Sequence, residues 1–305
     1  MTQKKFNHLR GDLFYDHNLA RYSSWRVGGD AERFYRPADL ADLKNFLDQL
    51  PQYEPLTWLG LGSNVLIRDG GIAGTVILTL NRLKEMKLYN KEAGKIIIRA
   101  EAGVTCAKLA RFCTSHRLEG GAFFAGIPGT VGGALAMNAG AFGGETWRYV
   151  VRVETINQCG ELYERIPDEF KIQYRQIEGL NNQFFVAGYF CFNQGNAVKE
   201  KEAINILLKK RNISQPIGTY SCGSVFRNPP GDHAARLIDL AGLKETRIGN
   251  AEVSKKHANF ILNKGDAKAA DIERLICHVA DRVYRVHGVR LIKEVHVIGC
   301  DYETA

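Results

Sequence analysis

A glycine-rich segment in the middle of the chain, residues 120–144, constrains the fold more than any other stretch. Nine of the 31 glycines fall in this window, and the residues between them are small or apolar, unlike the Ser and Lys of a flexible linker. Glycine lets the backbone approach a ligand closely or adopt positive φ, while Pro128 stiffens the middle and Ile127, Val131 and Leu135 can anchor the segment. We therefore predict that its backbone N–H groups cradle a phosphate or diphosphate.

Length and composition are those of a globular protein. The 305 residues, 45% hydrophobic and 24% charged, can bury a substantial core in two or three domains. No run approaches the roughly 18 apolar residues of a membrane helix, and residues 1–16 lack the apolar centre of a signal peptide. We therefore expect a cytoplasmic protein without membrane insertion. The net charge of +8 suggests an anionic partner, either nucleic acid or a small phosphorylated ligand.

The cysteines and histidines predict neither disulfides nor a metal site. The seven cysteines are odd in number and scattered, with no C-x-x-C pair, so we expect them to be reduced and mostly buried. The eight histidines show no ligand spacing.

The first two thirds of the chain predict an α+β domain. Apolar spacing indicates a helix over 40–50, capped by Asp39, and another that begins after Thr105. Residues 1–20 look like an extension or a loosely packed lead-in, and residues 25–37 read as strand, turn and strand. Further strands are predicted at 56–59, 65–67, 75–80, 95–100, 150–156 and 184–192.

The pattern changes from residue 196. The basic run 199–211 contains apolar residues, which favours an amphipathic helix with a solvated basic face. Helices near 234–243 and 270–285 frame a strand at 259–262, and a last strand is predicted over 289–299. We place the domain boundary near residue 195, which gives an extension (1–20), a first domain (21–195, with lobes 21–68 and 69–195) and a second domain (196–305).

The motif Gly60-Leu61-Gly62-Ser63-Asn64 lies between two predicted strands. A Rossmann fingerprint requires a helix after its glycines and a third glycine to pack that helix, and both are missing, so we reject it. A tight turn with Ser63 and Asn64 as hydrogen-bonding groups suits a phosphate or ribityl chain. A plain hairpin turn explains the motif equally well.

Three side chains are candidates for chemistry. Glu294 lies on a partly apolar strand face, where desolvation favours a neutral carboxyl that can carry a proton, although a structural ion pair is the commoner role. Ser224 follows a glycine in a turn without a G-x-S-x-G elbow, so it either donates a proton or holds the turn. Arg175, after Tyr174, offers paired donors for a carboxylate or phosphate, although most such arginines are structural.

Six motifs in one order resemble the family of UDP-N-acetylenolpyruvoylglucosamine reductases, flavin enzymes of bacterial peptidoglycan synthesis. The resemblance covers roughly residues 20–300 and is closer to the shorter second type of the family. The motifs are Trp25-Arg26-Val27-Gly28-Gly29, 60–66, 126–133 with 137–141, Tyr174-Arg175, 223–229 and Glu294.

The resemblance implies a fold, a reaction and ligands. The fold is α+β, with a two-lobed FAD-binding domain of the vanillyl-alcohol-oxidase (PCMH) type and a smaller α+β substrate-binding domain. NADPH reduces FAD, whose N5 then delivers hydride to the enolpyruvyl methylene of UDP-N-acetylglucosamine enolpyruvate, giving UDP-N-acetylmuramate. No nucleic acid and no obligate protein partner are implied.

The resemblance also implies residue roles. Ser224 acts as the general acid that protonates the enolate carbon, while Arg175 and Glu294 stabilise the substrate carboxylate and the enolate. A fixed guanidinium and a neutral carboxylic acid can do this in a dry site. The implied substrate contacts are Tyr174, Asn138, Arg227 and Asn228. The implied FAD contacts are Gly60, Leu61, Gly62, Ser63, Asn64, Gly126, Ile127, Pro128, Gly129, Thr130, Gly133 and Gly140.

Two rival functions remain open. One is a flavin oxidase of the same fold, although such relatives often tether FAD through His or Cys and no His occurs between Arg117 and Pro230. The other is a basic nucleic-acid-binding protein, which should interleave aromatic residues with Lys and Arg on one element. The aromatics here fall mainly in apolar strands instead.

Overall fold

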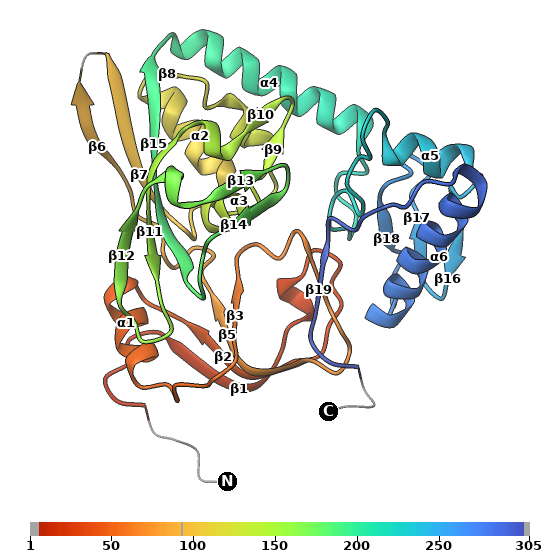
Figure 1. The fold of residues 1–305 in the computed structure, drawn as a ribbon, viewed down its shortest axis with the longest axis horizontal. Coiled ribbons are helices and arrows are strands. Elements are labelled where there is room, and N and C mark those ends of the chain that lie inside the picture. Colours follow the sequence, from red (N-terminus) through yellow and green to blue (C-terminus); the bar gives the residue numbers. More distant parts are fainter. Residues whose placement is uncertain (1–5, 93, 302–305) are drawn as a thin grey trace. The chain divides into compact units, whose positions relative to one another are not determined.

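The computed structural model describes residues 6–92 and 94–301, and the chain forms two compact units (Figure 1). The first unit consists of the chain up to Phe14, Arg33–Leu61 and Gly74–Lys209. The second consists of Tyr15–Glu32, Gly62–Ala73 and the chain from Lys210 onward. The predicted domains follow the chain in order, whereas these units do not. The reason is long-range pairing, such as that of β4 (Val65–Ile67) with β19 (His296–Ile298) in one parallel ladder.

An antiparallel sheet forms the centre of the first unit. Its strand order is β12 (Leu162–Arg165), β11 (Val150–Ile156), β15 (Phe184–Gln194), β7 (Lys95–Glu101) and β6 (Met86–Glu92), and β8 (Leu118–Glu119) pairs with β15. The predicted strands at 95–100, 150–156 and 184–192 are thus confirmed. Apolar side chains on one face, such as Ile98 and Phe190, share a core with Leu109 of α2 (Cys106–Ser115). Thr105 caps α2 as predicted, because its side chain accepts a hydrogen bond from the Lys108 amide.

A second sheet contributes to the first unit. Its order is β1 (Asp12–Asn18), β2 (Asp30–Arg36), β5 (Ile72–Leu78) and β3 (Leu56–Leu59), and the last two strands run parallel. Helix α1 (Leu40–Asp48) begins after Asp39, whose side chain accepts from the Asp42 amide as predicted. The Phe46 and Tyr35 rings stack with centroids 3.8 Å apart, which fixes α1 against β2.

Two sequence expectations near the N-terminus are wrong. Residues 6–18 are not a loosely packed lead-in, because Phe6, Leu9 and Leu13 pack on a buried core and β1 adds a strand; residues 1–5 lie outside the described part. Residues 25–29 are not a strand, because the Arg26 amide donates to the Ser23 carbonyl and closes a turn. Trp25 is fully buried in the core of the second unit, and its indole Nε1 donates to the Ile261 carbonyl.

The second unit packs short strands against one long helix. The strands β16 (Arg247–Ile248), β17 (Ala251–Val253) and β18 (Ile261–Asn263) pair in that order, and α5 (Ala234–Leu240) and α6 (Ala269–His287) contribute to the same core. The last strand is shorter than predicted, since only His296–Ile298 is a strand and Lys293 forms an isolated bridge with Phe226.

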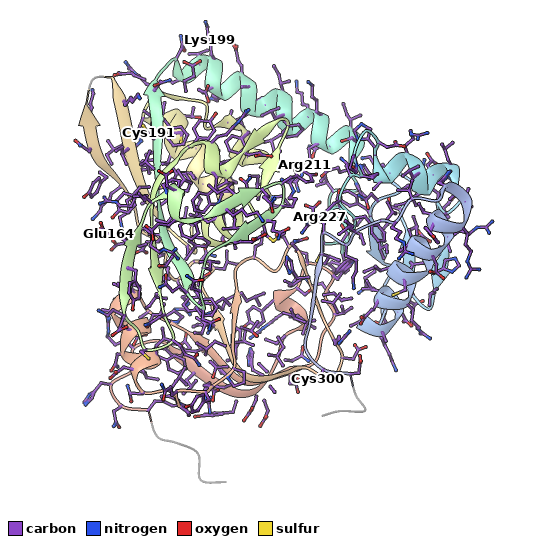
Figure 2. All side chains as sticks on the ribbon, viewed as in Figure 1. Glu164, Cys191, Lys199, Arg211, Arg227 and Cys300 are labelled. Atoms are coloured by element: carbon purple, nitrogen blue, oxygen red, sulfur yellow. The ribbon has the colours of Figure 1, made fainter. Side chains whose placement is uncertain are left out.

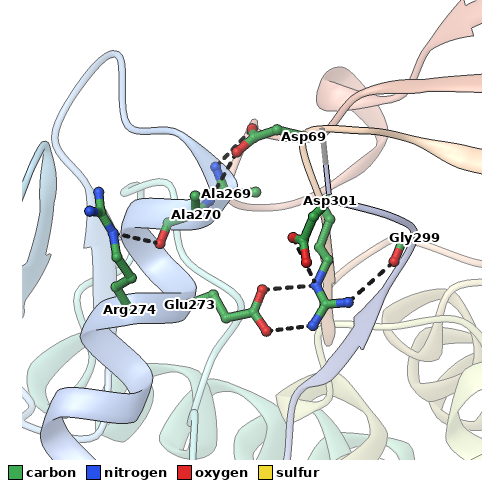
Figure 3. A network of polar contacts seen from close by, with 8 residues as sticks. Asp69, Ala269, Ala270, Glu273, Arg274, Gly299 and Asp301 are labelled. Atoms are coloured by element: carbon green, nitrogen blue, oxygen red, sulfur yellow. Dashed lines mark hydrogen bonds and ion pairs between the residues drawn. The ribbon is translucent and has the colours of Figure 1, made fainter. Parts of the chain in front are cut away.

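Polar contacts attach α6 to the segment before β5 (Figure 3). The Asp69 carboxylate accepts from the amides of Ala269 and Ala270, at 3.0 Å each, and so caps the helix. Arg68 pairs with Glu273 through two hydrogen bonds of 2.9 and 2.7 Å. Because the helix amides carry partial positive charge, the Asp69 carboxylate is well placed at this end.

Helix α4 (Ala197–Ser214) differs from the predicted amphipathic helix. Lys199 and Arg211 lie toward its two ends (Figure 2), but Glu200 is its only buried residue and Ile206 is 53% exposed. The apolar side chains therefore do not form one buried face. The remaining described elements are η1 (Ala20–Tyr22), η2 (Ala122–Gly126), α3 (Val131–Ala136), β9 (Gly140–Ala141), β10 (Gly144–Glu145), η3 (Thr146–Arg148), η4 (Pro167–Glu169), β13 (Lys171–Gln173) and β14 (Gln176–Glu178).

The cysteines are free thiols, and the expectation that most are buried is wrong. Cys106, Cys113 and Cys222 are buried, whereas Cys159 and Cys277 are exposed. No helix in residues 6–92 or 94–301 is long and apolar enough to cross a membrane.

Candidate active site

The glycine-rich segment contains a helix that its sequence does not predict. The 3₁₀ helix η2 leads through Pro128 to α3, and the Thr130 side chain caps α3 by accepting from the Gly133 amide at 3.4 Å. The first two amides of α3, Val131 and Gly132, donate to the carbonyls of Val104 and Ala102. These three amides are therefore already hydrogen-bonded within the protein.

Other amides remain available for a ligand. Thr130 is 1% exposed, yet among the described residues its backbone N–H has no acceptor, and a buried amide in this state is rare. The amide of Leu61 likewise has no acceptor in the described part of the chain. The two positions are neighbours, because a Cβ on Gly60 would collide with the Thr130 hydroxyl. Two predicted FAD contacts, Leu61 and Thr130, thus lie in neighbouring positions, and each has a free backbone N–H. Such a pair of donors suits a diphosphate.

The glycines of this region have different reasons to lack a side chain. A Cβ on Gly126 would lie 2.5 Å from the Phe142 ring, and one on Gly132 would lie 2.9 Å from the Ala102 Cβ, so packing demands both glycines. Gly133 is exposed in α3, has ordinary φ, and its Cβ would have no neighbour closer than 3.7 Å. Since glycine costs about 1 kcal/mol in a helix relative to alanine, Gly133 fits a site that keeps this space open for FAD.

Arg175 lies in a tight hairpin of the first unit. It occupies the two-residue turn between β13 and β14 with φ of +58°, and its guanidinium lies 4.8 Å from the centroid of the Tyr174 ring. Its Nη1 and Nη2 donate to the carbonyls of Asn138 and Gly140, at 3.3 and 3.0 Å. The structure thus brings together four of the predicted positions.

The Asn138 side chain serves the fold of this region. It is 2% exposed, donates to the Glu145 carboxylate and the Gln173 carbonyl, and accepts from the Trp147 amide. These bonds hold β10 and the β13–β14 hairpin to the segment that carries Gly140.

In the second unit, Ser224 and Glu294 lie on adjacent backbone segments. The Glu294 amide donates to the Val225 carbonyl at 2.8 Å, and the Arg227 amide donates to the Ile292 carbonyl at 2.9 Å. This pairing brings together the backbone segments that carry Ser224 and Glu294, although about 70 residues separate them in the chain. Both residues are partly exposed, so a ligand can reach them.

Asn64 joins the same group. Its side-chain amide donates to the Glu294 carbonyl at 3.1 Å, and its own carbonyl accepts from the His296 amide at 3.0 Å. The amides of Ser63 and Asn64 have no acceptor among residues 6–92 and 94–301. Asn64 therefore holds the strand of Glu294 with its side chain and offers its backbone to a ligand.

Cys222 links the turn of Ser224 to the loop of Gly62. Its thiol donates to the carbonyls of Gly62 and Val65, at 3.6 and 3.3 Å. Burial raises the pKa of the Cys222 thiol to about 12, which keeps the proton in place and makes the sulfur a poor nucleophile.

Two further residues near the segments of Ser224 and Glu294 are a neutral histidine and an asparagine that caps a helix. Burial, and then the charge of Arg227, lower the pKa of His296, so its ring is neutral at pH 7. The Asn228 side-chain oxygen accepts from the Ala234 amide at 3.1 Å and holds the start of α5. Arg227 is labelled in Figure 2.

Asn259 is a site residue that the sequence analysis missed. It is 3% exposed, and its side chain both accepts from the Phe226 amide and donates to the Phe226 carbonyl, at 2.9 and 2.8 Å. Its backbone carbonyl accepts from the Val225 amide at 2.9 Å. Asn259 thus fixes the two residues that follow Ser224. Only its polar character inside a predicted strand could have singled it out.

Comparison with family models identifies the cofactor class. No group of three or more His, Cys, Asp or Glu that could hold a metal occurs in the described residues. A family model for an FAD-binding domain matches residues 31–164, and the C-terminal domain of UDP-N-acetylenolpyruvoylglucosamine reductase matches residues 215–298. The fold and these matches define an FAD-dependent oxidoreductase with the expected α+β, vanillyl-alcohol-oxidase-type architecture.

Known proteins identify the family. The chain is 71% identical to a UDP-N-acetylenolpyruvoylglucosamine reductase of Coxiella burnetii, over 98% of this chain and 99% of that one, and 55% identical to one of Alkalilimnicola ehrlichii, over 95% of each. The crystal structure of the Thermus caldophilus UDP-N-acetylenolpyruvylglucosamine reductase superposes with a TM-score of 0.78 at 28% identity, covering 95% of this chain and all of that one. The chain belongs to the UDP-N-acetylenolpyruvoylglucosamine reductase family.

Proposed function

We propose that the chain reduces UDP-N-acetylglucosamine enolpyruvate to UDP-N-acetylmuramate, with FAD as its resident cofactor and NADPH as the reductant. Family membership and the match to an FAD-binding domain support this reaction. When bound, FAD supplies the hydride chemistry, since it can accept a hydride from NADPH and pass it to the enolpyruvyl methylene carbon. Because the nucleotides it would use are intracellular metabolites, we expect the chain to act in the cytoplasm.

The observation that carries the proposal is the pairing of two distant segments around Ser224 and Glu294. Backbone bonds join Val225 to Glu294, and Asn64 adds a side-chain bond to the same strand. These bonds hold the backbone segments of Ser224 and Glu294 to the loop of Asn64, which supports a site where a proton donor and a carboxyl group act together. Reduction of a carbon–carbon double bond needs such a donor beside the carbon that becomes basic.

Each side chain then has a distinct task. Hydride addition to the methylene carbon leaves negative charge on the neighbouring carbon and on the carboxylate attached to it. The Ser224 hydroxyl donates its proton to that carbon, which is basic enough to take it. Glu294 stabilises the enolate as a hydrogen-bond donor, and Arg175 binds the substrate carboxylate with paired N–H donors.

The proposal also assigns residues to the cofactor and to the substrate. In the first unit, the amides of Leu61 and Thr130 would hold the FAD diphosphate, and Gly133 would leave room for it. In the second unit, the amides of Ser63 and Asn64 are free donors for a ligand. Tyr174 and Arg227 contact the substrate. Asn138 and Asn228 support those contacts through the bonds that hold the Arg175 hairpin and the start of α5.

The test separates the two half-reactions. In Ser224→Ala, NADPH should still bleach the flavin absorbance at the wild-type rate, while reoxidation by the enolpyruvyl sugar should slow by about 10²–10⁴-fold, as expected for loss of a general acid. Ser221→Ala is the matched control, because this serine lies three residues away and its hydroxyl has no hydrogen-bond partner in the described chain. Equal loss of both half-reactions in Ser224→Ala would show that Ser224 is structural or binds the cofactor. A protein that cannot be loaded with FAD would contradict the whole proposal.

A further inference from the structure

A hollow of about 550 Å³ in the second unit has no role in the reaction described above. Arg26, which lines it, belongs to the motif Trp25-Arg26-Val27-Gly28-Gly29 of the family resemblance, to which no function was attached. Its lining residues are His17, Asn18, Ala20, Arg21, Arg26 and Tyr220. All of them belong to the second unit.

The hollow carries two positive charges without a counter-ion. In the part of the chain that the structure describes, neither Arg21 nor Arg26 forms an ion pair with a carboxylate. The carboxylate of Asp30 is engaged by the Asn18 side chain instead. Two guanidiniums that share a hollow repel each other, so an anion bound there would relieve the repulsion as well as form new bonds.

Hydrogen bonds and an aromatic ring hold both guanidiniums in place. Arg21 donates to the His17 ring at 3.1 Å and lies 4.9 Å from the centroid of the Tyr22 ring. Arg26 donates to the Arg21 carbonyl. Because none of these partners is a carboxylate, they orient the two arginines without supplying a negative charge.

The walls of the hollow are also fixed by buried bonds. Asn263, 6% exposed, donates from its side chain to the Trp25 carbonyl and from its backbone amide to the Tyr220 carbonyl, at 2.8 and 2.9 Å. Arg26 itself is held at φ of +60°, a conformation that L side chains adopt at a cost. The site is therefore organised before any ligand binds.

From this geometry we propose that the hollow binds the phosphate group of a nucleotide substrate. Guanidinium pairs match phosphate oxygens, and the ring of Tyr220, 52% exposed, offers a flat face on which a base or ribose can pack. The identity of the nucleotide rests on the proposed function, which supplies two sources. One is the 2′-phosphate of NADPH, and the other is the diphosphate of the UDP-sugar.

Binding of small probes to the FAD-loaded protein tests the site directly. Calorimetry with inorganic pyrophosphate should show binding to the wild type that weakens about tenfold or more in the double variant Arg21→Ala/Arg26→Gly. Glycine at position 26 tolerates the positive φ, so the fold should be retained. Arg282→Ala is the control for net charge, since Arg282 is exposed on α6 and forms no ion pair in the described residues. Equal pyrophosphate affinity in wild type and double variant, or no binding to either, would overturn the proposal.

Two further probes identify the source of the phosphate. If the site takes the NADPH phosphate, 2′-AMP should lose affinity in the double variant and UDP should not; the reverse result assigns the site to the UDP-sugar. Unchanged affinity for both would overturn the proposal. These measurements need no turnover, so a wild-type protein that binds the probes but fails to reduce the enolpyruvyl sugar would count against the proposed function and not against the site.

Discussion

At the scale of single residues, substitutions of the two neighbouring glycines of α3 distinguish a glycine needed for packing from one needed for ligand binding. Gly133→Ala adds a methyl group where nothing lies within 3.7 Å, so the FAD-free protein should be as stable as the wild type or up to about 1 kcal/mol more stable. If Gly133 contacts FAD as proposed, the same methyl group should lower the FAD content, because it fills the open space beside this residue. Flavin absorbance per protein and the thermal midpoint of the FAD-free protein measure the two effects.

Gly132→Ala is the matched comparison. Its Cβ would lie 2.9 Å from the Ala102 Cβ and 3.2 Å from the Ala102 carbonyl oxygen, which should cost about 1–3 kcal/mol of unfolding free energy. If Gly133→Ala binds FAD as the wild type does, Gly133 does not face the cofactor.

Asn259 should affect catalysis through the position of Ser224. Asn259→Ala removes two side-chain hydrogen bonds to Phe226, so we expect a loss of about 1–3 kcal/mol in unfolding free energy. Reoxidation of the flavin by the substrate should slow, while its reduction by NADPH should stay unchanged. Stopped-flow absorbance measures both steps, and Asn250→Ala, at an exposed position, is the control. A variant that slows both steps equally would contradict a positioning role.

These residues show what a motif can and cannot predict. Ser224 and Glu294 were predicted because each lies in a recognisable local pattern, and the structure does bring their segments together. Asn259 was missed because its role depends on hydrogen bonds with Phe226, more than 30 residues away, which leaves no local signal. The phosphate cradle was predicted for the glycine-rich segment as a whole, and its sequence does not reveal that the amides of Val131 and Gly132 are already used by the carbonyls of Val104 and Ala102.

At the scale of elements, a helix could be predicted where its cap lies next to it in the sequence, and was harder to predict where its contacts come from distant residues. The caps of α1 and α2, Asp39 and Thr105, are adjacent in sequence to their helices and were predicted. Helix α6 has a local cap, because the Asp271 carboxylate accepts from the Lys268 amide. Its first two amides, however, donate to Asp69, about 200 residues earlier, and no local pattern reveals that contact. Helix α3 has only six residues, two of them glycine, and forms because distant carbonyls accept its first amides.

Removal of the distant cap should destabilise the second unit. Asp69→Ala leaves the amides of Ala269 and Ala270 without their carboxylate, so we expect a loss of about 1–2 kcal/mol in unfolding free energy. Urea denaturation followed by circular dichroism measures the change. Asp281→Ala is the control, because this carboxylate is 72% exposed on the same helix. An equal, small effect of both substitutions would show that Asp69 does not cap α6.

At the scale of the whole molecule, the pH dependence of stability follows from two histidines of the second unit. Burial, and to a lesser degree the charge of Lys244, lower the pKa of His257 below its ordinary 6.5. Burial and then Arg227 do the same for His296. When the pH falls through 6.5, the unfolded chain takes up protons that the folded chain does not, so unfolding free energy should fall with pH in this window.

Glu101 contributes in the opposite direction at lower pH. Burial raises the pKa of its carboxyl above the ordinary 4.5, so the folded chain holds a proton that the unfolded chain has released. Comparison of a histidine variant with the wild type at each pH removes this contribution, because Glu101 is present in both proteins.

His257→Leu should therefore flatten the pH dependence. The leucine cannot take up a proton in either state, and it replaces a ring whose Nδ1 is buried without a hydrogen-bond partner in the described chain. Between about pH 7.5 and about pH 6, the wild type should lose more unfolding free energy than His257→Leu does. Urea denaturation at several pH values in this range measures both slopes. Parallel slopes would mean that His257 titrates alike in the folded and unfolded chains, and that burial does not hold its ring neutral.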